Sequence, residues 1–238
     1  MSPDIYRIWV YLAETPLLWL TATLVAYVVA ERLSRALGRH PLASPTILAA
    51  GLLVALLVAT DTPYADYFEG AQFVHFLLGP ATVALAIPLW HHRAQVRHNL
   101  VPMLAALFAG SVTAIVSAVG IAWAFGAPET ILWSLAPKST TSPIAMALTE
   151  PFGGIPALAA VLVLLTGMVG AIVVTPLMNL LRIRDFAARG FAAGVASHGL
   201  GTARAFQVSQ EAGTFAGIAL GLNGAMTAIL FLLIPLLL

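Results

Sequence analysis

Long apolar stretches separated by short polar clusters dominate the chain. A helix that crosses the bilayer core needs about 20 mainly apolar residues, and several stretches approach that length. The predicted membrane segments cover residues 16–30, 44–60, 72–90, 99–125, 130–150, 155–181, 191–209 and 212–238. The pattern predicts an all-α polytopic membrane protein with about seven or eight membrane segments, some of them broken by proline or re-entrant. We expect residues 1–238 to form a single integral membrane domain.

Composition supports this class of protein. Hydrophobic residues make up 60% of the 238-residue chain and charged residues only 9%, whereas a soluble domain carries about 25% charged residues. The net charge of +1 comes without a basic run, so a nucleic-acid partner is not expected. The absence of cysteine excludes disulfides and thiolate metal sites. The expected environment is the lipid bilayer, and residues 1–11 show no removable signal peptide.

Loop charges predict the orientation of the segments. Basic loops at residues 31–40, 91–98 and 182–189 should be cytoplasmic, and the acidic, interfacial loop at 61–69 should lie outside. Counting one crossing for each segment agrees with this until 130–150, and then places the last basic loop outside. A broken, re-entrant segment at 130–150 removes the conflict. The alternative is a full crossing with one basic loop outside.

An internal repeat is also predicted. At a shift of 57 positions, Leu78, Pro80 and Ile87 align with Leu135, Pro137 and Ile144. The same shift aligns Leu107, Gly110, Ala114, Ile115 and Val116 with Leu164, Gly167, Ala171, Ile172 and Val173. The units would be residues 72–125 and 130–181, each a proline-broken segment followed by a long helix. Such repeats are typical of secondary transporters, which bind substrate near the midplane of the membrane.

Lys138 stands within an otherwise apolar segment of membrane length. A charge at the bilayer centre costs about 2.5–3.5 kcal/mol, so such a residue indicates a functional site. Pro137 should break the helix, and Ser142 and Pro143 should cap and restart it. The ammonium, the restarted helix end and four hydroxyls predict a small-anion site formed by Lys138, Ser139, Thr140, Thr141 and Ser142. The alternative is a lysine that extends from a surface loop.

Arg204 is the second cation in a membrane-length segment. On a continuous helix it shares one face with Gly194, Ser197 and Gly201, where small residues allow close helix contact. Its guanidinium can bind a carboxylate through two hydrogen bonds. We therefore predict that Lys138 and Arg204 together bind a carboxylate. The alternative is a structural pairing of Arg204 with Glu150, Glu211 or backbone carbonyls.

Several neighbouring polar residues complete the predicted substrate site. His198 is a candidate proton relay because its reference pKa is near neutral; the alternative is a hydrogen-bonded core histidine. Thr202 lies four residues further on the same face as His198. Thr82 aligns with Ser139 in the first repeat, and Asn223 interrupts the last apolar segment. For Asn223 a structural hydrogen bond between helices is the favoured alternative.

Three stretches resemble the LrgB/CidB family. They are LAPKSTTSPIAM at residues 135–146, ASHGLGTARA at 196–205 and LGPATVALAIPL at 78–89. The first departs from the family pattern at Thr140 and Ser142, where Val and Thr are expected. The resemblance implies a multi-pass protein of the bacterial inner (plasma) membrane, described as antiholin-like and as an effector of murein hydrolase. It also implies a small holin-like LrgA/CidA-type partner, and relatives linked to glycolate, glycerate and pyruvate transport.

Two functions follow from these observations. The first is secondary transport of small 2-hydroxy or 2-oxo monocarboxylates through a midplane anion site. The second is antiholin-like regulation of a holin-like pore that controls murein hydrolase and autolysis. Neither is enzymatic, and the chain contains no G-x-x-x-x-G-K-[ST], H-E-x-x-H or G-x-S-x-G motif. No cofactor or metal is expected, and a homo-oligomer is compatible with the sequence.

Overall fold

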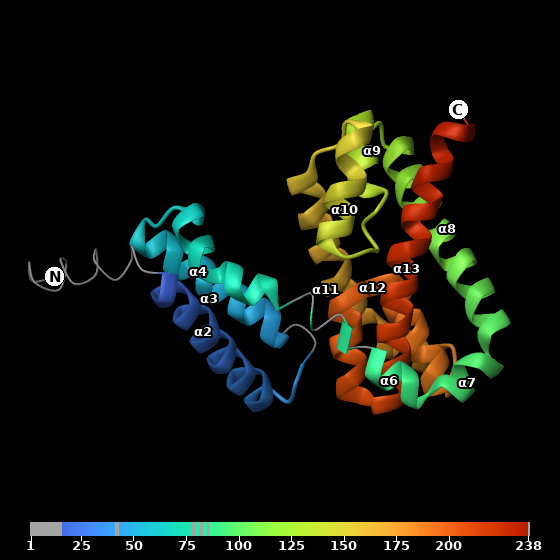
Figure 1. The fold of residues 1–238 in the computed structure, drawn as a ribbon, viewed down its shortest axis with the longest axis horizontal. Coiled ribbons are helices and arrows are strands. Elements are labelled where there is room, and N and C mark those ends of the chain that lie inside the picture. The colour runs from blue at the N-terminus through green and yellow to red at the C-terminus, as the bar shows by residue number, and fades with distance from the viewer. Residues whose placement is uncertain (1–15, 41–42, 78–79, 81–82, 85, 238) are drawn as a thin grey trace, which may run out of the picture. The chain divides into compact units, whose positions relative to one another are not determined.

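The computed structural model describes the chain except for residues 1–15, 41–42, 78–79, 81–82, 85 and 238. The regular elements among the described residues are all helices (Figure 1), which confirms the predicted all-α class. Their contacts divide the chain into two compact units, Met1–Ala84 and Leu85–Leu238. The single integral domain over 1–238 stays a prediction.

The first unit contains α2 (Pro16–Ala36), α3 (Pro45–Thr60) and α4 (Tyr64–Phe76). Asp61 ends α3 in the left-handed conformation, with φ of 51°. Residues 64–69, predicted as part of a loop, instead form the first turns of α4. The acidic residues at 61–69 are typical of a loop, but Tyr67 packs against Trp19 of α2 and Tyr64 stacks on Phe68 one turn further on, and these contacts stabilise a helix.

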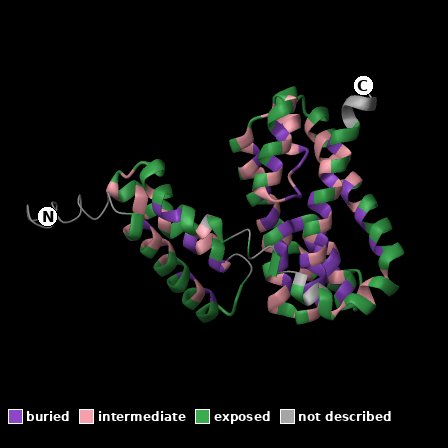
Figure 2. Ribbon diagram, viewed as in Figure 1, coloured by how far each residue is buried: buried purple, intermediate pink, exposed green. Residues whose placement is uncertain are grey.

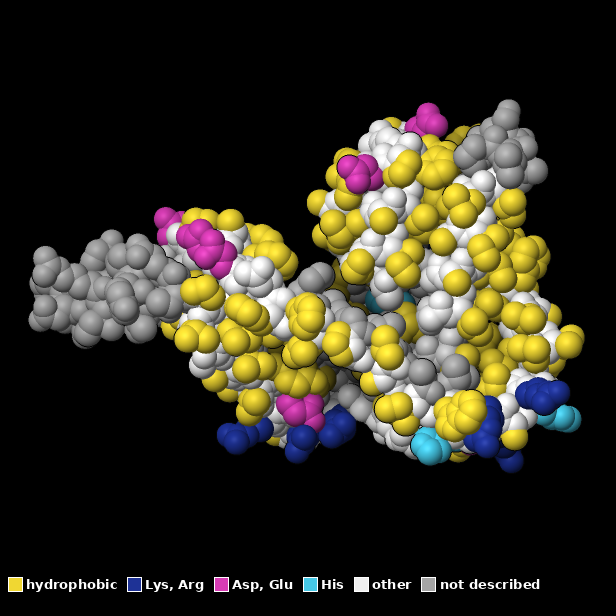
Figure 3. All heavy atoms as spheres, in the orientation of Figure 1, with side chains coloured by type: hydrophobic (Ala, Val, Ile, Leu, Met, Phe, Trp, Pro, Cys, Tyr) yellow, Lys and Arg dark blue, Asp and Glu magenta, His cyan; other side chains and the backbone are white. Residues whose placement is uncertain are grey.

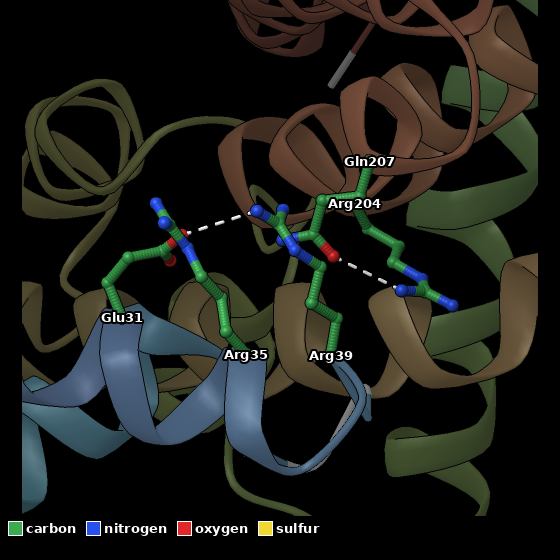
Figure 4. A network of polar contacts seen from close by, with 5 residues as sticks. All are labelled: Glu31, Arg35, Arg39, Arg204 and Gln207. Carbon is green, nitrogen blue, oxygen red and sulfur yellow. Dashed lines mark hydrogen bonds and ion pairs between the residues drawn. The ribbon is translucent and has the colours of Figure 1, made fainter.

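The basic end of α2 carries a small charge network (Figure 4). Arg35 Nε donates to Glu31 Oε1 at 2.7 Å, and an Arg39 guanidinium nitrogen lies 3.4 Å from the same oxygen. Both arginines are largely exposed, so the pairs add little stability.

The second unit holds the remaining helices of the described chain. They are α6 (Ala86–His91), α7 (Arg93–His98), α8 (Leu100–Ala124), α9 (Glu129–Leu135), α10 (Ser142–Thr149), η2 (Glu150–Phe152), α11 (Pro156–Leu180), α12 (Phe186–Val208) and α13 (Gln210–Leu237). Among the described residues α2, α8, α11 and α13 are long and apolar enough to cross a membrane. Burial is concentrated in α12 and α13 (Figure 2), which form the centre of this unit.

Helices α9 and α10 form a hairpin, called here the first hairpin. The Thr149 hydroxyl donates to the Trp133 carbonyl at 3.4 Å, and the Ile155 amide donates to Ser134 Oγ at 2.8 Å. The Phe152 ring stacks on Trp133 with centroids 4.7 Å apart. The chain therefore returns to the level at which it began, as the re-entrant segment predicted at 130–150 requires.

The restart of the first hairpin differs from the prediction by one residue. Helix α10 begins at Ser142, and Thr141 is the N-cap, with extended φ and ψ of −79° and 151°. Pro143 therefore follows the first helical position and does not occupy it. The offset arises because a serine and a threonine at adjacent positions are both acceptable N-caps.

Helix α12 is a second hairpin and not one straight helix. His198 has φ of 40° and ψ of −130°, outside helical values. A Cβ added to Gly201 would lie 2.6 Å from the Ala193 carbonyl oxygen, which a straight helix would not allow. One small hollow is lined by both Gly190 and Val208, although a straight helix would separate them by about 27 Å. The chain therefore reverses at His198.

This second hairpin corrects two predictions. Residues 191–209 do not form one crossing, because the chain returns to the end from which it started. Gly194 and Ser197 lie on one limb of the hairpin, while Gly201 and Arg204 lie on the other. The predicted common face is therefore wrong, since it assumed a continuous helix through His198.

On the face of the second unit seen in Figure 3, Lys and Arg side chains gather at one end, called here the basic end, and acidic side chains lie at the other. The basic end also holds Asp185 and Glu211. Residues 93–98, predicted as part of a basic loop, instead form α7. Gln95 and Asn99 line the same cavity as Asp185, so the predicted basic loops at 91–98 and 182–189 share the basic end. Helix α8 leads from there to the first hairpin, and α11 leads back to the second. Both basic loops thus satisfy the rule for cytoplasmic loops.

Cysteine labelling should report this arrangement. Glu129→Cys and Glu150→Cys should react with a membrane-impermeant maleimide from the same side, and Arg184→Cys only from the opposite side. The reason is that the first hairpin returns to the level at which it began, so we expect it not to cross the membrane. The chain has no native cysteine, so each signal has a single origin. Labelling of Glu129→Cys and Glu150→Cys from opposite sides would contradict the hairpin.

The long helices α8 and α11 each contain 25 residues, and each is followed by a hairpin. The two hairpins start from opposite ends of the unit. The predicted units at 72–125 and 130–181 begin instead with the broken segment. Part of the first one, at residues 78–79, 81–82 and 85, lies outside the described residues. The repeat therefore stays a prediction.

Candidate functional site

The tips of the two hairpins meet beside the middle of α13. Asn223 Nδ2 donates to the Ser139 carbonyl of the first hairpin at 2.9 Å. The same nitrogen donates to the Val195 carbonyl of the second hairpin at 3.2 Å. Ser111 of α8 donates to Asn223 Oδ1 at 2.6 Å. The buried Asn223 amide thus links α8 and the two hairpins to α13, next to the hairpin tips.

Lys138 lies at the tip of the first hairpin, next to this junction. It is half-buried, and its ammonium lies 3.3 Å from Ser139 Oγ. Within the described part of the chain, no ion pair involves Lys138. The ammonium is therefore a cation in an apolar unit without a carboxylate partner among the described residues.

A cavity of about 560 Å³ leads to Lys138 from the basic end. It runs between α8 and the first limb of α12. Its lining residues are Gln95, Asn99, Pro102, Met103, Ala106, Gly110, Ala114, Lys138, Ser139, Asp185, Ala187, Ala188, Phe191, Ala192, Val195, Ala196 and Phe215. The polar groups lie at the two ends, and the walls between them are apolar or small. A ligand that travels this route meets one positive charge, at the far end.

Asp185 is the only acidic residue in the described lining of this cavity, and it lies at the opposite end from Lys138. Its Oδ1 accepts a hydrogen bond from the Ala188 amide at 2.7 Å and so caps α12. This carboxylate already serves the helix N-terminus, a favourable place for negative charge. It does not neutralise Lys138.

The other hydroxyls of the first hairpin have different surroundings. Thr140 is fully buried, and its hydroxyl donates to the Pro137 carbonyl at 2.9 Å, which stabilises the turn. Thr141 and Ser142 are half-buried at the start of α10. Of the four predicted hydroxyls, only Ser139 lines the cavity together with Lys138.

His198 and Thr202 stabilise the second hairpin. His198 Nε2 lies 2.8 Å from the Val163 carbonyl, to which it donates, and the ring packs against Gly167 of α11. The Thr202 hydroxyl donates to the His198 carbonyl at 2.8 Å. Ser197 is buried against Gly170 of α11. None of these three residues lines the cavity at Lys138.

Arg204 lies elsewhere in the second unit. It lines a small hollow of about 20 Å³ together with Arg189 and Gly190 of the first limb of α12. Its guanidinium donates to Gln207 Oε1 at 3.1 Å (Figure 4). Lys138 and Arg204 therefore do not line a common cavity. The geometry does not support the prediction that they bind one carboxylate together. Thr82, also predicted at the site, lies outside the described residues.

Sequence reasoning missed the contribution of α8. Ser111 is buried and can donate to Asn223 or to the Leu107 carbonyl of its own helix, at 2.7 Å. A serine in an apolar helix is a weak signal, because it can satisfy itself in this way. Gln95 was also missed; it donates to Glu211 at 2.8 Å and ties α7 to α13 at the basic end.

Comparison with known proteins places the chain in a family. A model of the LrgB-like family matches residues 23–237. The protein YwbG of Bacillus subtilis, described as uncharacterized, is 36% identical over 77% of this chain and 82% of its own length. The holin-like protein CidB of Staphylococcus aureus is 26% identical over 90% of this chain and 93% of its own length. No solved structure matches the chain. The chain belongs to the LrgB-like family of membrane proteins.

Proposed function

We propose that this protein is a secondary transporter that carries small monocarboxylates of the glycolate, glycerate or pyruvate type across the bacterial inner membrane. The observation that carries the proposal is the Lys138 ammonium at the inner end of a cavity that reaches the basic end of the second unit. No carboxylate among the described residues is paired with it.

The chemistry of Lys138 favours an anion as ligand. An ammonium has three N–H donors, and Ser139 Oγ accounts for one of them. A carboxylate can accept the others. At about 4 Å the attraction is worth about 1 kcal/mol in water and about 4 kcal/mol at the lower effective dielectric of a protein site. Ser139 Oγ lies within reach of a 2-hydroxyl or 2-oxo group beside the carboxylate.

The lining of the cavity favours one negative charge over two. Of the residues that the structure describes, only Lys138 brings a Lys or Arg side chain to this lining, and Asp185 would repel a second carboxylate near the basic end. The walls from Pro102 to Ala114 offer carbon contacts and no further cation. A monocarboxylate therefore fits the lining better than a dicarboxylate.

The hairpins support transport as the mechanism. Broken helices that meet from opposite ends of a membrane unit are typical of secondary transporters, whose substrates bind at the breaks. Lys138 stands at one such break, and the second break at His198 lies three residues beyond Val195, which Asn223 links to the first hairpin.

Uptake into liposomes tests the proposal. Vesicles with the purified protein should accumulate labelled glycolate or pyruvate in a saturable way, whereas empty vesicles should not. Unlabelled monocarboxylates should compete at least about tenfold better than malonate, because a second carboxylate finds no second cation. The proposal would be overturned if glycolate, glycerate and pyruvate all showed no saturable uptake, although size-exclusion chromatography showed that the protein was folded.

A second candidate function is regulation of a holin-like pore, with murein hydrolase activity and autolysis as its downstream effects. The observation in its favour is that the Staphylococcus aureus relative is described as holin-like. This function would require a small LrgA/CidA-type partner. The same liposome assay distinguishes the two functions, since a regulator shows no flux alone and changes the flux of vesicles that contain the partner.

A further inference from the structure

We infer that Asn223 is a positioning residue that couples both hairpin tips to the anion site at Lys138. The inference rests on the proposed function and assigns a new role within the same site. Asn223 is only 1% exposed, and it does not line the cavity. Both of its N–H donors and its carbonyl oxygen have protein partners. It therefore acts on a ligand through other residues.

The two carbonyls bound by Asn223 lie at helix breaks, where no backbone N–H of a continuing helix is available to donate to them. The Ser139 carbonyl lies in the tip between α9 and α10, outside regular helix. The Val195 carbonyl lies in the last turn before His198, where the reversal interrupts the helical ladder. Inside a membrane an unpaired carbonyl is costly, because no water replaces the missing donor. A single amide supplies both donors.

The geometry links these bonds to the anion site. Ser139 follows Lys138 directly, and its hydroxyl is the hydrogen-bond partner of the Lys138 ammonium. Val195 lines the cavity, so its carbonyl bond also fixes part of the wall. Ser111 holds the Asn223 amide in the orientation that aims Nδ2 at both carbonyls. Loss of the amide donors would release the lysine tip and the cavity wall together.

Two substitutions at Asn223 separate the role of its N–H donors from the role of its side-chain shape. Asn223→Asp keeps the size and the acceptor for Ser111, but its side chain can donate to at most one of the two carbonyls when protonated and to neither when ionised. Asn223→Ala removes all three bonds. Thr214→Ala is the matched control: it removes a buried hydroxyl from the same helix, but that hydroxyl bonds only to Gln210 of its own helix.

In the liposome assay, both Asn223 variants should raise the KM for glycolate or pyruvate at least about tenfold, with Asn223→Asp at least as strong as Asn223→Ala. Thr214→Ala should keep the KM of the wild type. A purely structural role would lower the amount of folded transporter, and hence Vmax, at unchanged KM. Unchanged KM in both Asn223 variants would overturn the inference.

A labelling experiment tests the inference without transport. Ser139→Cys introduces the only cysteine, at a position that is 7% exposed, and leaves the backbone carbonyl in place. Adding Asn223→Asp or Asn223→Ala should speed its reaction with a maleimide at least about tenfold by releasing the tip. Adding Thr214→Ala should not change the rate. Equal rates in all backgrounds would also overturn the inference.

The two proposals can fail separately. If the wild type shows no saturable uptake, the proposed function fails, and the labelling rates alone decide whether Asn223 holds the hairpin tips. If the wild type transports but the Asn223 variants match it in KM and labelling rate, only the positioning role fails.

Discussion

Lys138→Ala should reduce saturable monocarboxylate uptake by a factor of about 100, since a hydrogen bond to a charged group contributes about 1.5–3 kcal/mol. Among the described residues the ammonium is the only basic side chain that lines the cavity, so none of them can replace it there. The fold should tolerate the change, because Lys138 has no ion-pair partner in the described chain that would be left buried without its counter-charge. Initial rates of labelled pyruvate uptake measure the effect.

Two further variants make this result specific. Arg184→Ala removes one positive charge from an exposed position at the basic end and should transport at close to the rate of the wild type. Lys138→Arg keeps the charge but replaces a compact ammonium with a larger planar group, and should retain part of the uptake with a changed KM. Full uptake by Lys138→Ala would show that Lys138 does not form the anion site.

Gly194→Ala should destabilise the second hairpin by about 2–3 kcal/mol. Gly194 lies directly against the Ala216 carbonyl of α13, and an added Cβ would also lie 2.8 Å from the Ala219 Cβ. Backbone on the opposite helix cannot move aside without separating α12 from α13, which form the buried centre of the unit. The expected result is a lower midpoint of thermal unfolding in detergent, measured by intrinsic fluorescence.

Gly199→Ala is the matched control in the same hairpin. A Cβ at Gly199 would find nothing within 4 Å, so no packing is disturbed. Alanine is also preferred over glycine in a helix by about 1 kcal/mol, so the control should be neutral or slightly stabilising. Equal destabilisation by Gly194→Ala and Gly199→Ala would show that close packing at Gly194 does not hold the hairpin.

The sequence predicted the first hairpin better than the second. Pro137, Pro143 and the hydroxyls between them are local signals for a helix break, and the break appears at those residues. No comparable signal marks His198, since the glycines around it are equally typical of a close-packed straight helix. The reversal there depends on contacts with α11 and α13 that lie far away in the sequence.

The candidate site shows the same division. Lys138 and Ser139 were predicted from sequence and do line a common cavity. Arg204 was predicted as their partner because both are cations in apolar segments. It lies in another hollow, because the second limb of α12 runs back towards the basic end. The role of Ser111 could not be predicted, since a bond between residues 112 positions apart leaves no local pattern.

The sequence by itself determined the class of the protein, the long apolar helices α8, α11 and α13, the break at Pro137 and the presence of a cation within a membrane-length segment. Each of these depends on local composition: apolar length, a missing backbone donor or the cost of a buried charge. Only the tertiary structure decided that α12 reverses, that both hairpin tips meet at Asn223 and that Lys138 and Arg204 line different cavities. These depend on distant packing and hydrogen bonds, which no single stretch of sequence encodes.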